Sequence, residues 1–90
     1  MRQEFEKILG EEIRYLAIET RERLNLTQKE MGERLQMGES SYSDIETGET
    51  ICASSVTETL LLHMQDDPKD FLNRINNRFD KLYEEGMMSV

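Results

Sequence analysis

The side chains that most often carry out catalysis are scarce in this chain of 90 residues. His63 is the only histidine and Cys52 the only cysteine, and neither has sequence neighbours that complete a nucleophile–base pair or a set of metal ligands. Because Cys52 is alone, no internal disulfide can form, and a small half-buried loop residue is favoured over a reactive thiol. The adjacent acids Glu11 and Glu12 are expected to be solvated charges. We therefore expect no enzymatic activity, no metal site and no cofactor.

Charge is distributed unevenly along the chain. The net charge is −8, and neither Lys nor Arg occurs between Arg34 and Lys69. That window contains only acidic charges: Glu39, Asp44, Glu46, Glu49, Glu58, Asp66 and Asp67. Such a balance keeps a protein in solution and repels a phosphate backbone. The sequence has no signal peptide and no apolar run of membrane-spanning length, so we expect a cytoplasmic protein without a membrane partner.

Apolar residues recur at steps of three and four, which predicts an all-α fold, a compact bundle of about five helices. Four of the expected helices cover about residues 3–23, 39–47, 54–64 and 68–85, and the remaining one begins at residue 27. Thr27 with Glu30 forms a predicted capping box, and Ser55 with Glu58 a second one. Gly10 marks a position where the first helix can kink or break.

Residues 27–48 have the pattern of a helix-turn-helix, with Gly32 as the small residue where the two helices cross closely. The chain resembles the Cro/repressor-type (XRE-like) helix-turn-helix family over about residues 13–64. The matching positions are Arg21, Leu26-Thr27-Gln28, Gly32, Ser41-Tyr42-Ser43-Asp44-Ile45-Glu46 and Gly48. The resemblance implies a lambda-repressor-like DNA-binding domain that reads operator DNA as a dimer.

The resemblance also assigns roles to individual residues. It implies a structural salt bridge between Arg21 and Glu46 and a phosphate contact from Gln28. Lys29, a basic residue next to Gln28, is also expected to face phosphates. It places base-edge contacts on the start of the third expected helix, at Glu39, Ser40, Ser41 and Asp44, with Ser43 near the DNA backbone. Carboxylates can accept from cytosine N4, and serine can pair with several base edges. The alternative is that Glu39 only complements the helix dipole and that Asp44 lies on a solvated face.

Two departures from the family pattern bear on these roles. Gln36 stands in the turn where the family has glycine, and positive φ costs a non-glycine residue roughly 1–2 kcal/mol. We therefore expect a differently shaped turn in which Gly38 takes up the bend. The loop 49–53 lacks the basic residues that hold phosphates, so binding would depend on Lys29, Arg34 and arginines of the first helix. Weak non-specific binding with a shallow salt dependence follows.

We interpret residues 1–90 as a single domain with an N-terminal helix extension over 1–12 and a C-terminal amphipathic helix over 68–85. The apolar face of that last helix is expected to pack on Phe5, Ile8 and Leu9 and to build a dimer or partner surface; purely intrachain packing is the alternative. The face consists of Phe71, Leu72, Ile75, Phe79, Leu82 and Tyr83, and the dimer or partner surface is assigned to Phe71, Ile75, Phe79 and Leu82.

Two functions follow from the sequence. The first is a homodimeric, sequence-specific transcriptional regulator that binds double-stranded operator DNA. The alternative is a protein-interaction module on the same fold, such as an antitoxin, anti-repressor or adaptor, which uses its acidic third helix and does not bind DNA.

Overall fold

The computed structural model describes residues 2–50 and 53–86 and contains five helices and no strand in these ranges. The helices are α1 (Arg2–Arg23), α2 (Gln28–Arg34), α3 (Glu39–Thr47), α4 (Ser55–His63) and α5 (Lys69–Glu84). The predicted all-α class is confirmed. Cys52, predicted to be a half-buried loop residue, lies outside the described residues. None of the five helices is long and apolar enough to cross a membrane.

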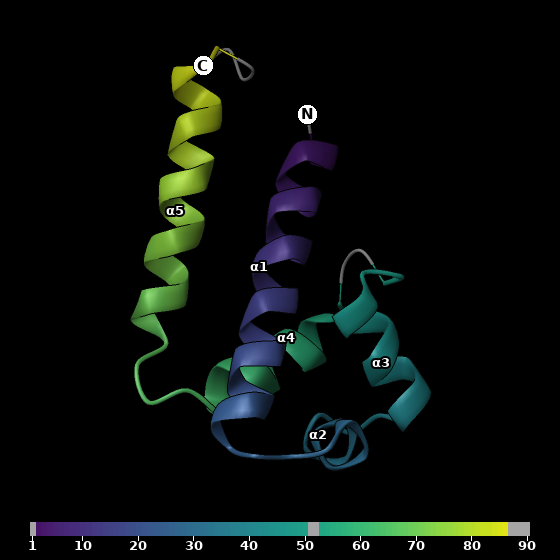
Figure 1. The fold of residues 1–90 in the computed structure, drawn as a ribbon. Coiled ribbons are helices and arrows are strands. Elements are labelled where there is room, and N and C mark those ends of the chain that lie inside the picture. Colours follow the sequence, from purple (N-terminus) through teal and green to yellow (C-terminus); the bar gives the residue numbers. More distant parts are fainter. Residues whose placement is uncertain (1, 51–52, 87–90) are drawn as a thin grey trace.

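The long helix α1 organises the fold (Figure 1). Helices α2, α3 and α4 gather around its C-terminal half, while α5 runs antiparallel to α1 and accompanies its N-terminal half. The molecule is therefore elongated, with extents of 43 × 26 × 18 Å. Gly10, where a kink or break was expected, lies inside the uninterrupted α1.

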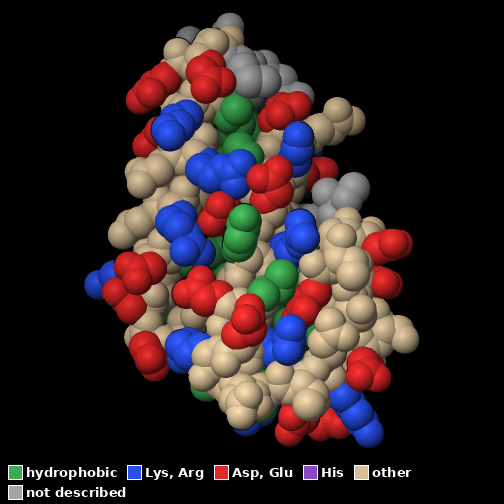
Figure 2. Space-filling model, in the orientation of Figure 1, with side chains coloured by type: hydrophobic (Ala, Val, Ile, Leu, Met, Phe, Trp, Pro, Cys, Tyr) green, Lys and Arg blue, Asp and Glu red, His purple; other side chains and the backbone are tan. Residues whose placement is uncertain are grey.

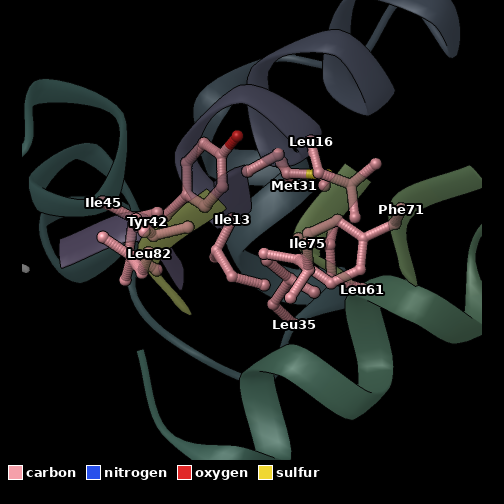
Figure 3. Close-up of a cluster of buried hydrophobic side chains, with 12 residues drawn as sticks. Ile13, Leu16, Met31, Leu35, Tyr42, Ile45, Leu61, Phe71, Ile75 and Leu82 are labelled. Atoms are coloured by element: carbon pink, nitrogen blue, oxygen red, sulfur yellow. The ribbon is translucent and has the colours of Figure 1, made fainter. Parts of the chain in front are cut away.

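A single cluster of buried apolar side chains joins the five helices, and Figure 3 shows α1 residues Ile13 and Leu16 surrounded by side chains of the other helices. The buried apolar residues are Ile8, Ile13, Leu16, Ala17, Met31, Leu35, Tyr42, Ile45, Leu61, Phe71, Ile75 and Leu82. Burying one such side chain stabilises the fold by about 1.5–3 kcal/mol. Because α1 contributes to both ends of this cluster, it fixes α3 and α5 relative to each other.

Helix α5 packs on the N-terminal half of α1. The rings of Phe5 and Phe79 meet edge to face with centroids 4.7 Å apart. Phe71, Ile75 and Leu82 are buried, at 4%, 7% and 8% exposure. Three of the four side chains predicted to form a dimer or partner surface are therefore already covered within the chain. Any such surface on α5 needs other residues.

Ion pairs reinforce the contact between α1 and α5. Both carboxylate oxygens of Glu12 are engaged, by Arg74 Nε at 3.1 Å and Arg78 Nη1 at 2.9 Å, and Arg78 Nη2 donates to Glu11 at 3.0 Å. The exposed fraction of Glu12 is only 9%. The interpretation of Glu11 and Glu12 as solvated charges was therefore wrong for Glu12, because two guanidinium groups compensate its burial.

Side-chain caps set the starts of α2 and α4. The capping box of α2 is present, since Thr27 Oγ1 accepts from Glu30 N at 3.1 Å and Glu30 Oε1 accepts from Thr27 N at 2.9 Å. At α4 the cap is Ser54, which accepts from Thr57 N at 3.3 Å. The predicted capping box of Ser55 with Glu58 was thus wrong, because the cap lies one residue earlier and consists of the Ser54 hydrogen bond alone.

Candidate nucleic-acid interface

The two helices of the motif approach each other at Gly32. A Cβ at this position would lie 2.9 Å from the carbonyl oxygen of Met37, and Met37 N donates to Gly32 O at 2.8 Å. Any side chain would push the turn away from α2. Glycine is therefore required for the close crossing that sets the direction of α3.

The turn between α2 and α3 bends at Gln36, which has a φ of 61°. Gly38, which was expected to take up the bend, is extended with a φ of −74° and precedes α3 as its N-cap. That expectation was wrong. The structure tolerates the strain of a left-handed glutamine, whose amide donates to Glu33 O at 3.2 Å, and the bend stays at the position where the family has glycine.

Three side chains hold Glu46, near the C-terminal end of α3. Arg21 grips the carboxylate with two nitrogens, Nε to Oε2 at 2.5 Å and Nη2 to Oε1 at 3.1 Å. Gln28 Nε2 donates to Oε1 at 3.1 Å, and Arg14 Nε donates to the backbone oxygen of Glu46 at 2.7 Å. Residues of α1 and α2 thus fix α3 through one glutamate.

The electrostatics of this group follow from its burial. Only 9% of the Glu46 side chain is exposed. Burial works against its ionisation, but the hydrogen bonds from Arg21 and Gln28 outweigh burial, so the pKa of Glu46 lies below its usual value. The hydrogen bond between Arg21 and Glu46 also raises the pKa of Arg21. Both groups therefore stay charged at neutral pH.

A hollow of about 330 Å³ lies on the outer side of α3 and the start of α2. It is lined by five of the seven residues predicted to contact DNA: Gln28, Glu39, Ser40, Ser43 and Asp44. The other two, Lys29 and Ser41, are exposed outside it. The lining offers carboxylate acceptors, hydroxyls and one amide, but no cation.

Basic side chains near the hollow are few, and two arginines of α1 are already engaged with α3. Arg14 and Arg21 hold Glu46. Lys29 and Arg34 on α2 are exposed, and neither side chain has a hydrogen bond to another described residue. Over most of α3 the charged side chains visible in Figure 2 are acidic, whereas basic ones are interleaved with acids over α1 and α5.

Sequence reasoning did not single out Arg14 as a partner of Glu46. The spacing contained a signal, since Arg14 precedes Arg21 by two helical turns and therefore lies on the same face of α1. The backbone oxygen that it reaches is not visible in a sequence pattern.

Fold, turn and the fixed position of α3 define a helix-turn-helix domain. A family model described as a helix-turn-helix domain matches residues 9–65, more than half of the chain. The chain belongs to the helix-turn-helix family, a class of DNA-binding domains. No curated protein and no solved structure matches it in sequence or fold comparisons.

Proposed function

We propose that this chain is a sequence-specific transcriptional regulator of the Cro/repressor type that reads operator DNA with α3. The observation that carries the proposal is the hollow shared by Gln28, Glu39, Ser40, Ser43 and Asp44. It lies on the outward side of a helix that Arg21 and Arg14 hold through Glu46. Carboxylates there would accept from the N4 amino group of cytosine, and hydroxyls would pair with several base edges.

Phosphate contacts would come from the few groups near this hollow. Lys29 supplies an exposed cation, and Gln28 keeps one amide hydrogen after donating to Glu46. Since such contacts supply most non-specific affinity, we expect weak binding to random DNA. The reading unit in this proposal is a homodimer whose two α3 helices enter successive major grooves, about 34 Å apart.

A second candidate function is a protein-interaction module on the same fold. The observation that favours it is the acidic hollow, which Glu39 and Asp44 line and no cation shares. Such a surface repels a phosphate backbone and attracts a basic partner. An antitoxin, anti-repressor or adaptor would use it in this way.

Selection from a random duplex pool at about 50 mM salt separates the two candidates, because low salt maximises phosphate affinity. If the chain reads operator DNA, the selection should enrich a palindromic site. The preferred bases in that site should change when the selection is repeated with Glu39→Ala or Asp44→Ala. Glu33→Ala is the matched control, since it removes the same charge from an exposed position of α2 outside the hollow. Absence of enrichment by a folded protein would refute operator reading and favour the interaction module.

A further inference from the structure

A second hollow, the α1–α3 groove, lies between the N-terminal half of α1 and the C-terminal end of α3. The N-terminal half of α1 extends past the end of α3 (Figure 1) and forms one side of the groove. The volume of the groove is about 460 Å³, which is the size of a small-molecule site. It shares no lining residue with the hollow on the outer side of α3. Its lining includes Glu6, Lys7, Gly10, Glu11, Arg14 and Gly48.

Two cations of the groove are not compensated by a carboxylate. Lys7 is exposed, and its ammonium group has no hydrogen bond or ion pair with the part of the chain that the structure describes. Arg14 uses only its Nε, which donates to the backbone oxygen of Glu46 at 2.7 Å. Both Nη groups of Arg14 therefore remain available as donors, in the end-on fork that binds an acid group with two hydrogen bonds.

The two acids of the groove, in contrast, already have basic partners. Glu6 pairs with Arg2 at 3.1 Å, and Glu11 accepts from Arg78 at 3.0 Å. Glu49 follows the end of α3 but does not line the groove. In a chain with a net charge of −8, the groove therefore presents positive charge and favours an anion.

Gly10 lies between the two cations. Lys7 precedes it by three residues and Arg14 follows it by four, so the three residues share one face of α1. Glycine destabilises a helix interior relative to alanine, yet α1 continues through Gly10 without interruption. Because Gly10 has no side chain, an acid group can lie on the helix between Lys7 and Arg14. Carbon atoms form most of the groove wall, which suits a ligand with an apolar body.

Arg14 connects the groove to α3. Its Nε holds the backbone oxygen of Glu46, and its Nη1 lies beside Gly48, where an added Cβ would be 3.9 Å away. A ligand bound to the Nη groups would hold the same guanidinium that fixes α3. Binding in the groove and the position of α3 would then be linked through one side chain.

We propose that the α1–α3 groove binds a small organic anion, with its carboxylate or phosphate between Lys7 and Arg14 and its apolar body along the carbon wall. The bound anion keeps Arg14 on Glu46 and so steadies α3, which makes the groove a regulatory site. This regulatory role rests on the proposed function, whereas binding does not. The tests use no DNA, so failure of the groove and failure of operator reading can be told apart.

Proton–nitrogen correlation NMR of the full chain measures binding with four probes. Hexanoate and hexyl phosphate have an acid group and an apolar body, hexylammonium reverses the charge, and inorganic phosphate lacks the body. We expect the two acids to shift the backbone amides of Lys7, Gly10 and Gly48 with a Kd of about 1 mM, as for a ligand of this size. The tighter of the two identifies the acid group. No saturable shift with either at about 10 mM, or equal binding of hexylammonium or inorganic phosphate, would overturn the proposal.

Two variants test where the acid group lies. Lys7→Gln should raise the Kd about fivefold, because it removes one exposed charge contact. Lys81→Gln is the matched control, since it removes an exposed cation of α5 outside the groove, and should leave the Kd unchanged. Gly10→Leu should abolish binding by filling the place of the acid group, and circular dichroism checks that the variant is folded. An unchanged Kd in Lys7→Gln or in folded Gly10→Leu would refute the assigned position.

The Nε–H signal of Arg14 tests the link to α3. The bound acid should slow the exchange of this hydrogen with water several-fold, because it keeps the guanidinium on Glu46. The Nε–H of Arg74, which pairs with Glu12 at 3.1 Å, is the internal control and should exchange at an unchanged rate. Unchanged or faster exchange at Arg14 would overturn the regulatory role, since the ligand would then not hold Arg14 on α3.

Discussion

Arg14 and Glu46 are joined across 32 residues of chain by a hydrogen bond of 2.7 Å from the guanidinium Nε to the backbone oxygen. Arg21 and Gln28 hold the carboxylate of the same residue. Glu46 therefore connects α3 to α1 and α2 through its backbone and side chain together. The direction of α3 thus depends on a residue outside the hollow proposed to face DNA.

Removing the carboxylate of Glu46 should cost the fold about 3 kcal/mol, as expected when one partner of a buried ion pair is lost. Glu46→Ala leaves the Arg21 guanidinium, whose side chain is only 23% exposed, without its carboxylate. Urea denaturation followed by circular dichroism measures the change in free energy of unfolding. Exposed Glu49→Ala is the control and should change it by less than about 0.5 kcal/mol. A loss below about 1 kcal/mol in Glu46→Ala would contradict a strongly coupled pair.

Stability should fall on acidification, and Glu46 should account for part of the fall. Its pKa is lower in the folded than in the unfolded state, so its contribution is present above the unfolded pKa and is lost as pH falls through the folded pKa. We expect the free energy of unfolding to fall below about pH 5, and to fall less steeply in Glu46→Gln. Urea titrations at a series of pH values measure both slopes.

Glu58 provides a control of opposite sign. Burial raises its pKa, so the folded state is penalised as pH rises through that value. Glu58→Gln should therefore be more stable than the wild type at pH 7 and should keep the acid-induced loss. Equal pH slopes in the wild type and Glu46→Gln would show that the ion pair is not linked to this loss.

A methyl group at Gly32 should destabilise the motif by about 1–3 kcal/mol, the usual cost of forcing an extra group into a packed contact. In Gly32→Ala the new Cβ would lie 2.9 Å from a backbone oxygen, which cannot rotate away. Gly38→Ser is the matched control, since a Cβ there meets nothing within 4 Å and serine is a good N-cap. Thermal melting compares the two, and equal melting temperatures would show that the close crossing at Gly32 is not required.

The left-handed turn residue allows a stabilising substitution. Gln36→Gly should raise the free energy of unfolding by up to about 1 kcal/mol, because it removes the strain of a φ of 61° but adds freedom to the unfolded chain. The same denaturation experiment measures it. A destabilised Gln36→Gly variant would mean that the hydrogen bond from Gln36 to Glu33 O outweighs the strain.

The sequence predicted the helices because their apolar periodicity and caps are local signals. The capping box at Thr27 and the glycine at Gly48 lie within a few residues of the helix ends that they set. The match to the family pattern named Arg21 and Glu46 as partners, and the structure pairs them at 2.5 Å. Their separation of 25 residues makes this a tertiary contact, which periodicity alone cannot specify.

Tertiary contacts explain what the sequence did not predict. The pattern of α5 contains two neighbouring apolar stripes, and only packing against α1 decides that Ile75 is buried while Leu72 is exposed. In the sequence Glu12 has the pattern of a solvated acid, because its partners Arg74 and Arg78 lie far along the chain on α5. The bend at Gln36 directs α3 so that Glu46 meets Arg21. This tertiary contact outweighs the local preference for glycine at positive φ.

The small number of cations near the hollow leads to a prediction about salt. With Lys29 and Arg34 as the exposed cations of α2 in each protomer of the proposed homodimer, the logarithm of the DNA association constant should fall with the logarithm of salt concentration with a slope of about −3.6. Fluorescence anisotropy on the selected duplex measures this slope. Lys29→Gln should reduce its magnitude by about 2, because one fewer counterion is released for each of the two protomers.

Lys81→Gln, which removes an exposed cation of α5, is the control and should leave the slope unchanged. A slope near −7 would require about eight phosphate contacts, four from each protomer. Arg14 and Arg21 would then have to leave Glu46 when DNA binds, and α3 would lose the contacts that fix it. A shallow slope that Lys29→Gln does not change would show that Lys29 does not face the phosphate backbone.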